Sequence, residues 1–382
     1  MYSISGYGSM IADRARTDAY AEALSKAVQP GSVVLDIGTG TGFFALLACR
    51  FGARRVYAIE PADAIAVAKE MAAANGYSDR IEFIQDLSTR VILPERADVI
   101  ISDLRGVLPL FQHHLPSIID ARKRLLAPDG ILIPRRDLLW AAIVEAPEIY
   151  KNYAAPWEDN SYGLSLISGR RFATNSWAKA RIKPEQLLVE PECLATLDYT
   201  SLDSHDINAE VKWIASREGL AHGLSIWFDC ELIEGVSLSN KPGAPELIYG
   251  SAFFPLSETV AVSPGDRICV TLRADLVGDD YIWRWETQVT DRDSPAKVKA
   301  DFKQSTFFAV PLSSAQLRKR AASHVPTLNE EGQIERFILS QMDGSTSLEE
   351  IARRALHEFP GRFAKWHDAL TRVGELSLKC SQ

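Results

Sequence analysis

The stretch VVLDIGTGTGFFALLA, residues 33–48, decides the fold of this chain. It begins with an apolar run typical of a buried strand and ends with one typical of a helix. The glycines between them, Gly38, Gly40 and Gly42, are spaced GxGxG. A dinucleotide fingerprint, GxGxxG, needs glycine at the position of Phe43. The loop therefore favours a nucleoside without a pyrophosphate, with the backbone passing close under a ribose.

Acidic residues stand where a ribose-binding carboxylate is expected. The next predicted strand, Val56–Glu60, ends about 20 residues after the glycine loop, and the Glu60 carboxylate can accept from both ribose hydroxyl groups. QDLS, residues 85–88, follows the third predicted strand, where an adenine would lie. A glycine turn after a strand is common on its own, but this combination resembles the cofactor site of the class I methyltransferases. The resemblance implies S-adenosyl-L-methionine as the cofactor, bound by Asp36, Gly38, Thr39, Gly40, Gly42, Glu60, Asp86 and Leu87.

The first part of the chain, residues 1–134, alternates apolar strands with alanine-rich helices. This alternation predicts an α/β domain with a doubly wound parallel sheet of Rossmann-like type. The predicted strands are Val33–Ile37, Val56–Glu60, Ile81–Ile84, Ala97–Ser102 and Gly130–Pro134. Between them, helical periodicity marks Gly42–Phe51, Ala62–Asn75 and Leu115–Leu126.

Two further domains are predicted after the α/β domain. Residues 135–310 carry strand-like runs separated by Gly, Pro, Asn and Asp, and they hold most of the tryptophans. We interpret them as an all-β module, a sandwich or a barrel, with tryptophans in its core or at dimer contacts. Residues 320–382 are helical again: Ser347 and Glu350 are typical of a capping box, and a third helix is expected from about Arg362. These residues predict a small separate domain.

Composition limits the class of protein. Apolar residues make up 46% of the 382 residues and charged residues 24%, which is typical of a soluble globular protein. The net charge of −8 argues against a general attraction to nucleic acid. The five cysteines form no CxxC pair, which argues against a disulfide framework and a thiolate zinc site. Since no run reaches about 18 apolar residues and the start lacks a signal-type apolar core, we expect a cytoplasmic protein without membrane or metal partners.

The segment YGSMIADRARTDAY, residues 7–20, resembles the N-terminal helix of the protein arginine methyltransferases, whose pattern is M-L-x-D-x-x-R-T-x-x-Y. The places of the pattern are occupied by Met10, Asp13, Arg16, Thr17 and Tyr20. The similarity extends over roughly residues 7–290. It implies that the β module is a barrel, that Arg16 pairs with the cofactor carboxylate, and that the protein is a homodimer. The family's dimerisation arm falls at about residues 165–185, near Leu164, Phe172 and Trp177.

Two positions depart from the family's substrate clamp, which is a pair of glutamates. Asp103 and Gln112 stand there, so one carboxylate charge replaces two. The family's Thr-His-Trp triplet is replaced by Leu247, Ile248 and Tyr249. We also expect no counterpart of the family's upstream tyrosine-bearing segment, because the chain begins too close to the helix pattern.

These departures change the expected acceptor. We expect methyl transfer to a nitrogen or oxygen of a small molecule or a peptide and not to a standard protein arginine, with Asp103 orienting the nucleophile. One alternative is a true protein or peptide arginine N-methyltransferase with a modified clamp. The other is a non-catalytic scaffold that keeps the cofactor fold.

Further polar residues lie beside this loop and in the C-terminal part. Arg105, His113 and His114 are candidates to face the acceptor, with a histidine as general base, although the histidines can equally cap the next helix at the surface. His222 is interpreted as structural. Residues 325–360 resemble the winged-helix domains of the peptide-chaperone family in pyrroloquinoline quinone synthesis, which implies leader-peptide binding along a strand edge. The alternative is a helical bundle that only packs on the barrel.

Overall fold

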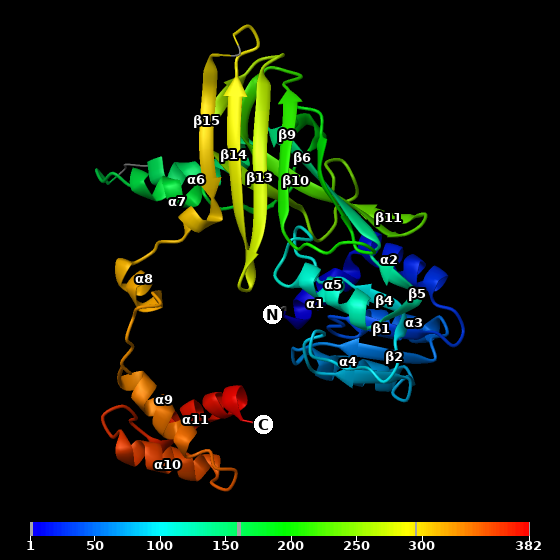
Figure 1. The fold of residues 1–382 in the computed structure, drawn as a ribbon, viewed down its shortest axis with the longest axis vertical. Coiled ribbons are helices and arrows are strands. Elements are labelled where there is room, and N and C mark those ends of the chain that lie inside the picture. The colour runs from blue at the N-terminus through cyan, green and yellow to red at the C-terminus, as the bar shows by residue number, and fades with distance from the viewer. Residues whose placement is uncertain (1–2, 159–161, 295, 382) are drawn as a thin grey trace. The chain divides into compact units, whose positions relative to one another are not determined.

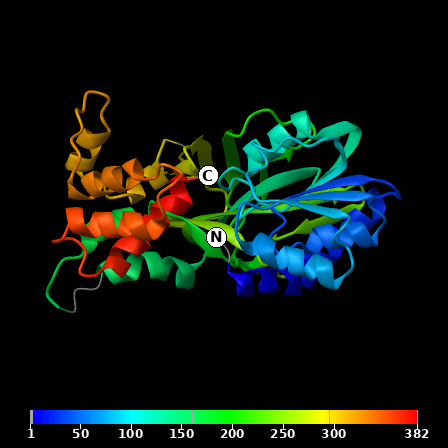
Figure 2. The ribbon, with the colours of Figure 1, turned by 90° about the horizontal axis from the view of Figure 1, so that it is seen from below.

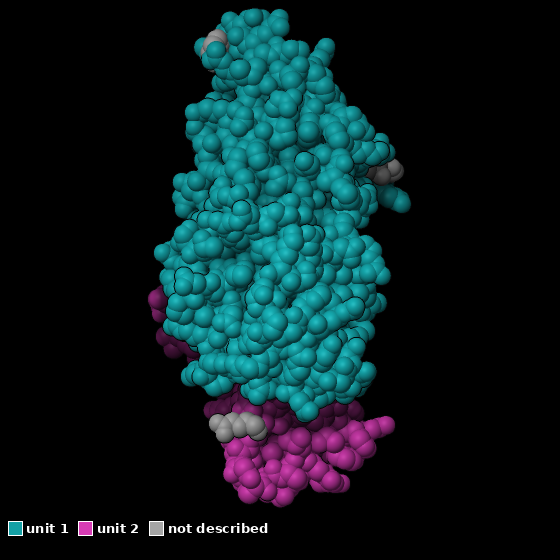
Figure 3. Space-filling view, turned by 90° about the vertical axis from the view of Figure 1, so that its right-hand side faces the viewer, with its two compact units in different colours: residues 1–311 teal, residues 312–382 magenta. Residues whose placement is uncertain are grey.

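The computed structural model describes residues 3–158, 162–294 and 296–381. The chain forms two compact units, unit 1 with residues 1–311 and unit 2 with residues 312–382 (Figure 3). Unit 1 contains an α/β domain followed by a β-rich domain (Figure 1). No helix among the described residues combines the length and apolar character that crossing a bilayer requires.

A five-stranded parallel sheet forms the centre of the α/β domain. Its strands are β1 (Val33–Ile37), β2 (Arg55–Ile59), β3 (Ile81–Ile84), β4 (Ala97–Ser102) and β5 (Leu126–Ile133), in the order β3-β2-β1-β4-β5. Helix α5 (His114–Arg124) covers one face, and α3 (Phe43–Arg50) and α4 (Ala64–Ala74) cover the other (Figure 2). Every residue of β1 is buried, as expected for a central strand covered on both faces. The strand order reverses beside β1, so a ligand site is expected at the carboxyl ends of these strands.

Two helices precede the sheet, α1 (Ile4–Ala12) and α2 (Arg14–Ala27). Asp13 caps α2, because its Oδ1 accepts the backbone N–H of Arg16 at 3.1 Å. Its Oδ2 accepts the backbone N–H of Ile248 at 2.6 Å and ties this cap to the β-rich domain. The buried face of α2 comprises Arg16, Thr17, Tyr20, Ala23, Leu24 and Ala27. The helix therefore directs Arg16 and Tyr20, one turn apart, toward the interior.

The β domain, residues 136–305, consists of two antiparallel sheets. Its strands are β6 (Arg136–Val144), β7 (Ala178–Ala180), β8 (Glu192–Asp198), β9 (Ile207–Ile214), β10 (Gly219–Ile233), β11 (Val236–Ser239), β12 (Ser251–Val262), β13 (Arg267–Val277), β14 (Asp280–Thr290) and β15 (Val298–Ser305). One sheet has the order β7-β12-β10-β6-β8, with β11 paired to β10, and the other has the order β15-β14-β13-β9. Among the described residues no hydrogen-bonded ladder joins the two sheets. The prediction of a closed barrel is therefore corrected to two separate sheets.

Aromatic side chains fill the space between the two sheets. Trp283 and Trp285 of β14 are almost fully buried, and both ring centroids lie 5.2 Å from that of Phe254 in β12. Trp177 stacks on the same phenylalanine with centroids 5.8 Å apart. These tryptophans form the core, which is one of the two roles expected from the sequence.

Several short helices interrupt or follow the β domain. Between β6 and β7 lie α6 (Pro147–Glu158), the 3-10 turn η1 (Ile167–Gly169) and α7 (Arg170–Ala173). Two more 3-10 turns are η2 (Pro184–Gln186) and η3 (Thr306–Ala309). Leu164, in the expected dimerisation arm, is 63% exposed, whereas Phe172 is half-buried.

Unit 2 consists of α8 (Ser314–Arg320), α9 (Glu330–Ser340), α10 (Leu348–Glu358) and α11 (Trp366–Cys380). The last three helices enclose a core of their own, made of Ile334, Ile338, Ile351, Ala352, Ala355, Phe363, Ala369, Val373 and Leu376. Ser347 caps α10 as predicted, since its hydroxyl accepts the N–H of Glu350 at 3.3 Å. The described residues of this unit contain no strand. The predicted strand edge for a leader peptide is therefore wrong.

Candidate functional site

The three glycines between β1 and α3 adopt backbone angles that other residues disfavour. The φ angles are +74° for Gly38, +55° for Gly40 and +84° for Gly42. A Cβ atom on Gly38 would lie 2.2 Å from Cδ2 of Leu104, and one on Gly40 would lie 2.4 Å from the ring of Tyr7. Conformation and close packing therefore both require glycine at these positions.

Asp36 lies near the carboxyl end of β1 and is 1% exposed. Its Oδ2 accepts a hydrogen bond of 2.6 Å from the hydroxyl of Thr39. Burial raises the pKa of Asp36 to about 7, and the hydrogen bond from Thr39 offsets this only in part. The glycine loop therefore encloses a carboxyl group that changes its charge near neutral pH.

Glu60 follows directly after β2 and is 7% exposed. Its Oε2 accepts the N–H of Gly40 at 3.0 Å, and its Oε1 accepts the N–H of Ala62 at 2.9 Å. A carboxylate has about four acceptor sites, so two remain for the hydroxyl groups of a ribose. Glu60 thus connects the ends of β1 and β2 while keeping the capacity that the sequence analysis assigned to it.

Asp86 and Leu87 follow β3, the neighbour of β2 in the sheet. Asp86 accepts the N–H of Leu87 at 2.7 Å, and the Leu87 side chain is 45% exposed. An exposed apolar side chain beside polar groups suits the face of an adenine. The glycine loop, the Glu60 carboxylate and this apolar surface all lie at the carboxyl ends of adjacent strands. The set fits S-adenosylmethionine. No group of three or more His, Cys, Asp or Glu among the described residues is arranged to hold a metal ion.

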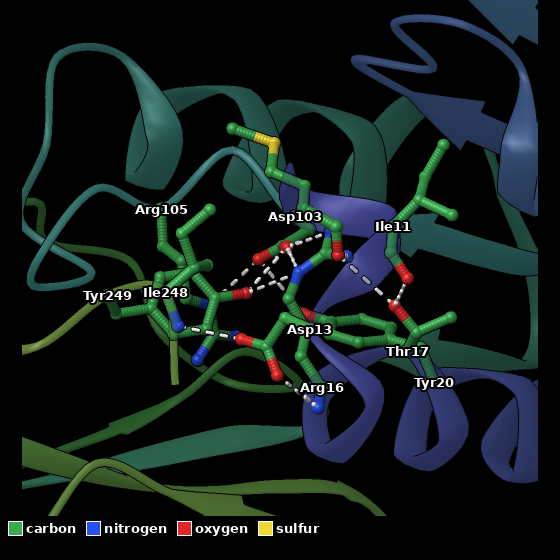
Figure 4. A network of polar contacts seen from close by, with 10 residues as sticks. Ile11, Asp13, Arg16, Thr17, Tyr20, Asp103, Arg105, Ile248 and Tyr249 are labelled. Atoms are coloured by element: carbon green, nitrogen blue, oxygen red, sulfur yellow. Dashed lines mark hydrogen bonds and ion pairs between the residues drawn. The ribbon is translucent and has the colours of Figure 1, made fainter. Parts of the chain in front are cut away.

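Arg16 and Asp103 form a buried ion pair beside the glycine loop (Figure 4). The Nη2 and Nε atoms of Arg16 lie 2.5 Å and 2.7 Å from Oδ2 of Asp103. Both side chains are 7% exposed. Burial alone would lower the pKa of Arg16, but Asp103 raises it, so the guanidinium stays charged. Arg16 was predicted to hold a cofactor carboxylate; in the structure its partner is a carboxylate of the protein.

Asp103 has three further partners in the same network (Figure 4). The hydroxyl of Tyr249 donates to Oδ2 at 2.6 Å, and that of Tyr20 donates to Oδ1 at 3.1 Å. The Nε atom of Arg105 lies 3.3 Å from Oδ1. Burial by itself would raise the pKa of Asp103, but Arg16 and Arg105 together hold it below its ordinary value. Asp103 is therefore an ionised carboxylate, and each of its two oxygens lies beside one arginine and one tyrosine.

Arg105 lies behind Asp103 and is fully buried. Its Nη1 donates to Oδ1 of Asp137 at 2.9 Å, and both side chains are 0% exposed. Tyr199 donates to the other oxygen of Asp137, and the guanidinium of Arg105 lies 4.9 Å from the ring centroid of Phe228. The sequence analysis considered Arg105 a candidate to face the acceptor; the structure places it between Asp103 and the β domain.

The two adjacent histidines separate in the structure. His114 is 1% exposed, and its Nε2 lies 3.3 Å from the hydroxyl of Tyr199. Burial lowers the pKa of His114 to about 3, with Arg105 acting in the same direction, so it stays neutral. His113 occupies the N-cap position of α5 and its Nε2 lies 3.0 Å from Asp279. Among the described residues no hydrogen bond joins either histidine to Asp103, and the lowered pKa makes His114 a weak base.

Gln112 is not brought together with Asp103. It is exposed, its φ angle is +44°, and its side chain has no hydrogen-bond partner among the described residues. Of the two residues predicted at the substrate clamp, only Asp103 takes part in the buried network. Leu247 and Tyr249 are 4% and 7% exposed, and only the tyrosine reaches the network.

Sequence reasoning missed the hydroxyl donors and the second ion pair of this site. Tyr20 follows Arg16 by one helical turn, a spacing that signals a shared face. Tyr7 and Met10 of α1 are three residues apart, which is again the spacing of side chains on one helix face. No counterpart of the family's upstream tyrosine segment was expected from the sequence. Nothing in the sequence pattern pairs Arg105 with a residue of another domain.

Two family models match unit 1, and they meet where the α/β domain passes into the β domain. Residues 15–139 match the family model of ribosomal protein L11 methyltransferase, and residues 136–288 match the arginine methyltransferase oligomerization subdomain. A probable protein arginine N-methyltransferase 6 of Arabidopsis thaliana is 32% identical over 267 residues, which are 68% of this chain and 61% of that relative. An arginine N(omega)-methyltransferase of Streptomyces achromogenes subsp. streptozoticus is 29% identical over 272 residues, covering 69% of this chain and 74% of the relative.

A solved structure shows the same fold. It is the Trypanosoma brucei PRMT1 enzyme–prozyme heterotetrameric complex with AdoHcy, with a TM-score of 0.71 and 21% sequence identity, covering 78% of this chain and 96% of that one. Residues 289–382 lie outside both family models. The first two domains are thus similar in sequence to protein arginine methyltransferases, and they share the fold of the solved complex.

Proposed function

We propose that this chain is an enzyme that transfers the methyl group of S-adenosyl-L-methionine to a nitrogen or oxygen of an acceptor. The observation that carries the proposal is the convergence of the glycine loop, Asp36 and Glu60 at the carboxyl ends of β1 and β2. This crevice is where open α/β sheets bind nucleosides. The structural neighbour with AdoHcy, which has the same fold, supports the same cofactor.

The reaction is an in-line displacement. The cofactor supplies a methyl group on a positively charged sulfur; the acceptor atom forms the new bond to carbon as the carbon–sulfur bond breaks, and the sulfur keeps the electron pair. The acceptor nitrogen or oxygen then gives its proton to water. The protein's part is to align the reactants, which can contribute roughly 7–11 kcal/mol. Asp103 orients the methyl acceptor by a hydrogen bond. Because its pKa is lowered, it is a weak base and does not take the proton.

Each residue of the site has a distinct part in this proposal. Glu60 binds the ribose, and Leu87 lies against the adenine. Arg16 binds the cofactor's carboxylate, a role that its contact with the Asp103 carboxylate supports, where Nε and Nη2 both reach Oδ2. Asp103 remains beside the acceptor, held by Tyr20 and Arg105.

The acceptor is a small molecule or a peptide group other than a standard protein arginine. A guanidinium is bound well by carboxylates with free acceptor positions and uncompensated charge. With Arg16 on the cofactor, Asp103 still has Arg105 beside Oδ1 and hydrogen bonds from Tyr20 and Tyr249, so its charge remains partly compensated. Gln112 adds no charge and is exposed.

Arginine methylation with a modified clamp is the second candidate. The names of the relatives favour it, because they include both protein arginine and arginine N(omega)-methyltransferases. It requires that Asp103 release Arg16 to the cofactor and accept the substrate guanidinium in its place. A non-catalytic scaffold is less well supported, since Asp36, Glu60 and Arg16 are all in place.

We also propose that the protein is a homodimer. The match to the oligomerization subdomain supports self-association, and the exposed apolar side chains of the expected arm offer a surface for it.

Two measurements test the proposed function. Calorimetry with S-adenosylhomocysteine should show micromolar binding, and its absence in a folded protein would leave only the scaffold. Transfer of labelled methyl should then be measured on Arg-Gly-rich peptides, on free arginine and on a metabolite extract. We expect little transfer to the peptides by the unmodified chain and a modest gain with Gln112→Glu, because an exposed charge is screened by solvent. Strong methylation of the peptides by the unmodified chain would establish the second candidate.

A further inference from the structure

Arg105 compensates the charge of Asp103 from the side opposite Arg16. Its Nε atom lies 3.3 Å from Oδ1 of Asp103, whereas both contacts from Arg16 are made to Oδ2. The two arginines thus act on different oxygens of one carboxylate. If Arg16 turns to the carboxylate of a bound cofactor, Arg105 is the cation that remains at Asp103.

Neighbouring side chains confine Arg105, although its Nε and Nη2 atoms make no hydrogen bond within the described part of the chain. Asp137 of β6 pairs with it at 2.9 Å, and the ring of Phe228 lies against its guanidinium with a distance of 4.9 Å to the centroid. Tyr199 holds Asp137 in turn. The side chain of Arg105 is 0% exposed, so it has no solvent-facing conformation to move into without breaking a buried ion pair. Its charge is therefore a permanent part of the acceptor site.

We propose that Arg105 is a positioning residue that determines acceptor specificity: it keeps the Asp103 carboxylate charge-compensated, so the site accepts an uncharged nucleophile and rejects a guanidinium. This inference rests on the proposed function, because it concerns the same site. A neutral N–H or O–H group needs to donate only one hydrogen bond to Asp103 to be oriented. A guanidinium would face Arg105 across that carboxylate, and both cations would then act on Asp103, since among the described residues Asp137 pairs with Arg105 alone.

The size of the effect follows from the loss of one charged partner. The loss of one charge-assisted hydrogen bond lowers the affinity for a guanidinium about ten- to a hundredfold. Removal of the Arg105 charge should raise the affinity for a guanidinium by this factor. The affinity for a neutral group of the same shape should stay unchanged. This selectivity by charge distinguishes the proposal from a purely structural role.

The experiment compares two blocked tripeptides, Gly-Arg-Gly and Gly-citrulline-Gly, which have similar shape and differ in charge. Their dissociation constants are measured in the presence of saturating S-adenosylhomocysteine. The test variant is Arg105→Met with Asp137→Asn, which removes both members of the buried pair. A second variant, Arg105→Gln, keeps a donor for Asp137 and serves if the first does not fold. Arg105→Lys is the conservative control, since it keeps the charge.

The unmodified chain and Arg105→Lys should show no preference for the arginine peptide. Both neutral variants should bind it about ten- to a hundredfold more tightly, with the citrulline peptide unchanged. An unchanged ratio of the two affinities in a folded neutral variant would overturn the proposal, as would a preference for arginine in the unmodified chain. Failure of S-adenosylhomocysteine to bind the unmodified chain is a separate result that rejects the proposed function itself.

Discussion

The hydroxyl of Tyr249 donates a 2.6 Å hydrogen bond to Oδ2 of Asp103 and accepts one of 2.9 Å from Nε of Arg16. Burial and the neighbouring Asp103 raise the pKa of Tyr249 well above its ordinary value, so the phenol remains a donor at all ordinary pH values. Tyr249 stands where the protein arginine methyltransferases have the tryptophan of their Thr-His-Trp triplet. An indole N–H can donate but cannot accept, so a tryptophan here would offer no acceptor to Nε of Arg16. The acceptor site therefore departs from the family on the β-domain side as well as in the clamp.

Substitution of Glu60 should weaken cofactor binding. Glu60→Ala removes the acceptor of the Gly40 and Ala62 N–H groups together with the ribose contact, and we expect a loss of ~1.5–3 kcal/mol in the binding of S-adenosylmethionine. Calorimetry on the folded variant measures it. Glu82→Ala, an exposed position on β3, is the matched control and should bind normally. Normal affinity in folded Glu60→Ala would remove Glu60 from the ribose site.

The stability of unit 1 should fall as the pH rises toward neutrality because of Asp36. Its pKa is raised to about 7 in the folded protein, from an ordinary value of 3.8. The folded state therefore binds the proton more tightly, so the contribution is fully present below about pH 4 and is lost as the pH rises through 7. The full shift corresponds to on the order of 4 kcal/mol. Asp36→Asn, which cannot ionise, should abolish this part of the pH dependence.

Chemical denaturation of unit 1 at several pH values measures this effect. Asp18→Asn removes a carboxylate that is exposed on α2, and it serves as the control for a general change of charge. Parallel stability curves for Asp36→Asn and the unmodified protein between pH 4 and 8 would show that Asp36 does not titrate in this range.

The arm between β6 and β7 should mediate self-association. Leu164 is 63% exposed and Ile167 is 51% exposed, so a double substitution to glutamate costs no packing within the chain and should convert a dimer to a monomer. Light scattering on eluting protein measures the mass. Ile92→Glu, at an 89% exposed site in the α/β domain, should leave the dimer intact. A monomer at high micromolar concentration of the unmodified chain would contradict the prediction.

Unit 2 should fold without unit 1. Residues 312–382 have their own core, and Ile351 at its centre is 1% exposed. We expect the isolated fragment to show helical circular dichroism and a cooperative melt that Ile351→Asp abolishes. Leu378→Asp, at a 92% exposed position of α11, should leave the melt unchanged. A disordered fragment would show that unit 2 depends on contacts with the rest of the protein.

The sequence predicted the cofactor half of the site because that half is local. Asp36, the glycine loop and Glu60 lie at the ends of consecutive strands, and strands of a parallel sheet end at one edge. The spacing of apolar runs was therefore sufficient to place them together. The same local signals identified the cap at Ser347, since a capping interaction spans only three residues.

The acceptor half could not be predicted in this way. Asp103 meets Tyr20 and Tyr249 from two other parts of the chain, and Arg105 meets Asp137 across a domain boundary. Such contacts depend on how two domains pack, which periodicity does not contain. The prediction of a closed barrel was wrong for a related reason. Closure depends on hydrogen-bonded ladders between strands that are distant in sequence.

The ion pair between Arg105 and Asp137 also constrains how this protein can change by recombination. Each residue lies in a different domain of unit 1, and each is 0% exposed. A chimera that takes one domain from a relative lacking the partner residue would bury an uncompensated charge, at a cost of about 3–5 kcal/mol. The two domains are thus inherited as a matched pair, whereas residues 312–382 can be gained, lost or exchanged without touching that pair.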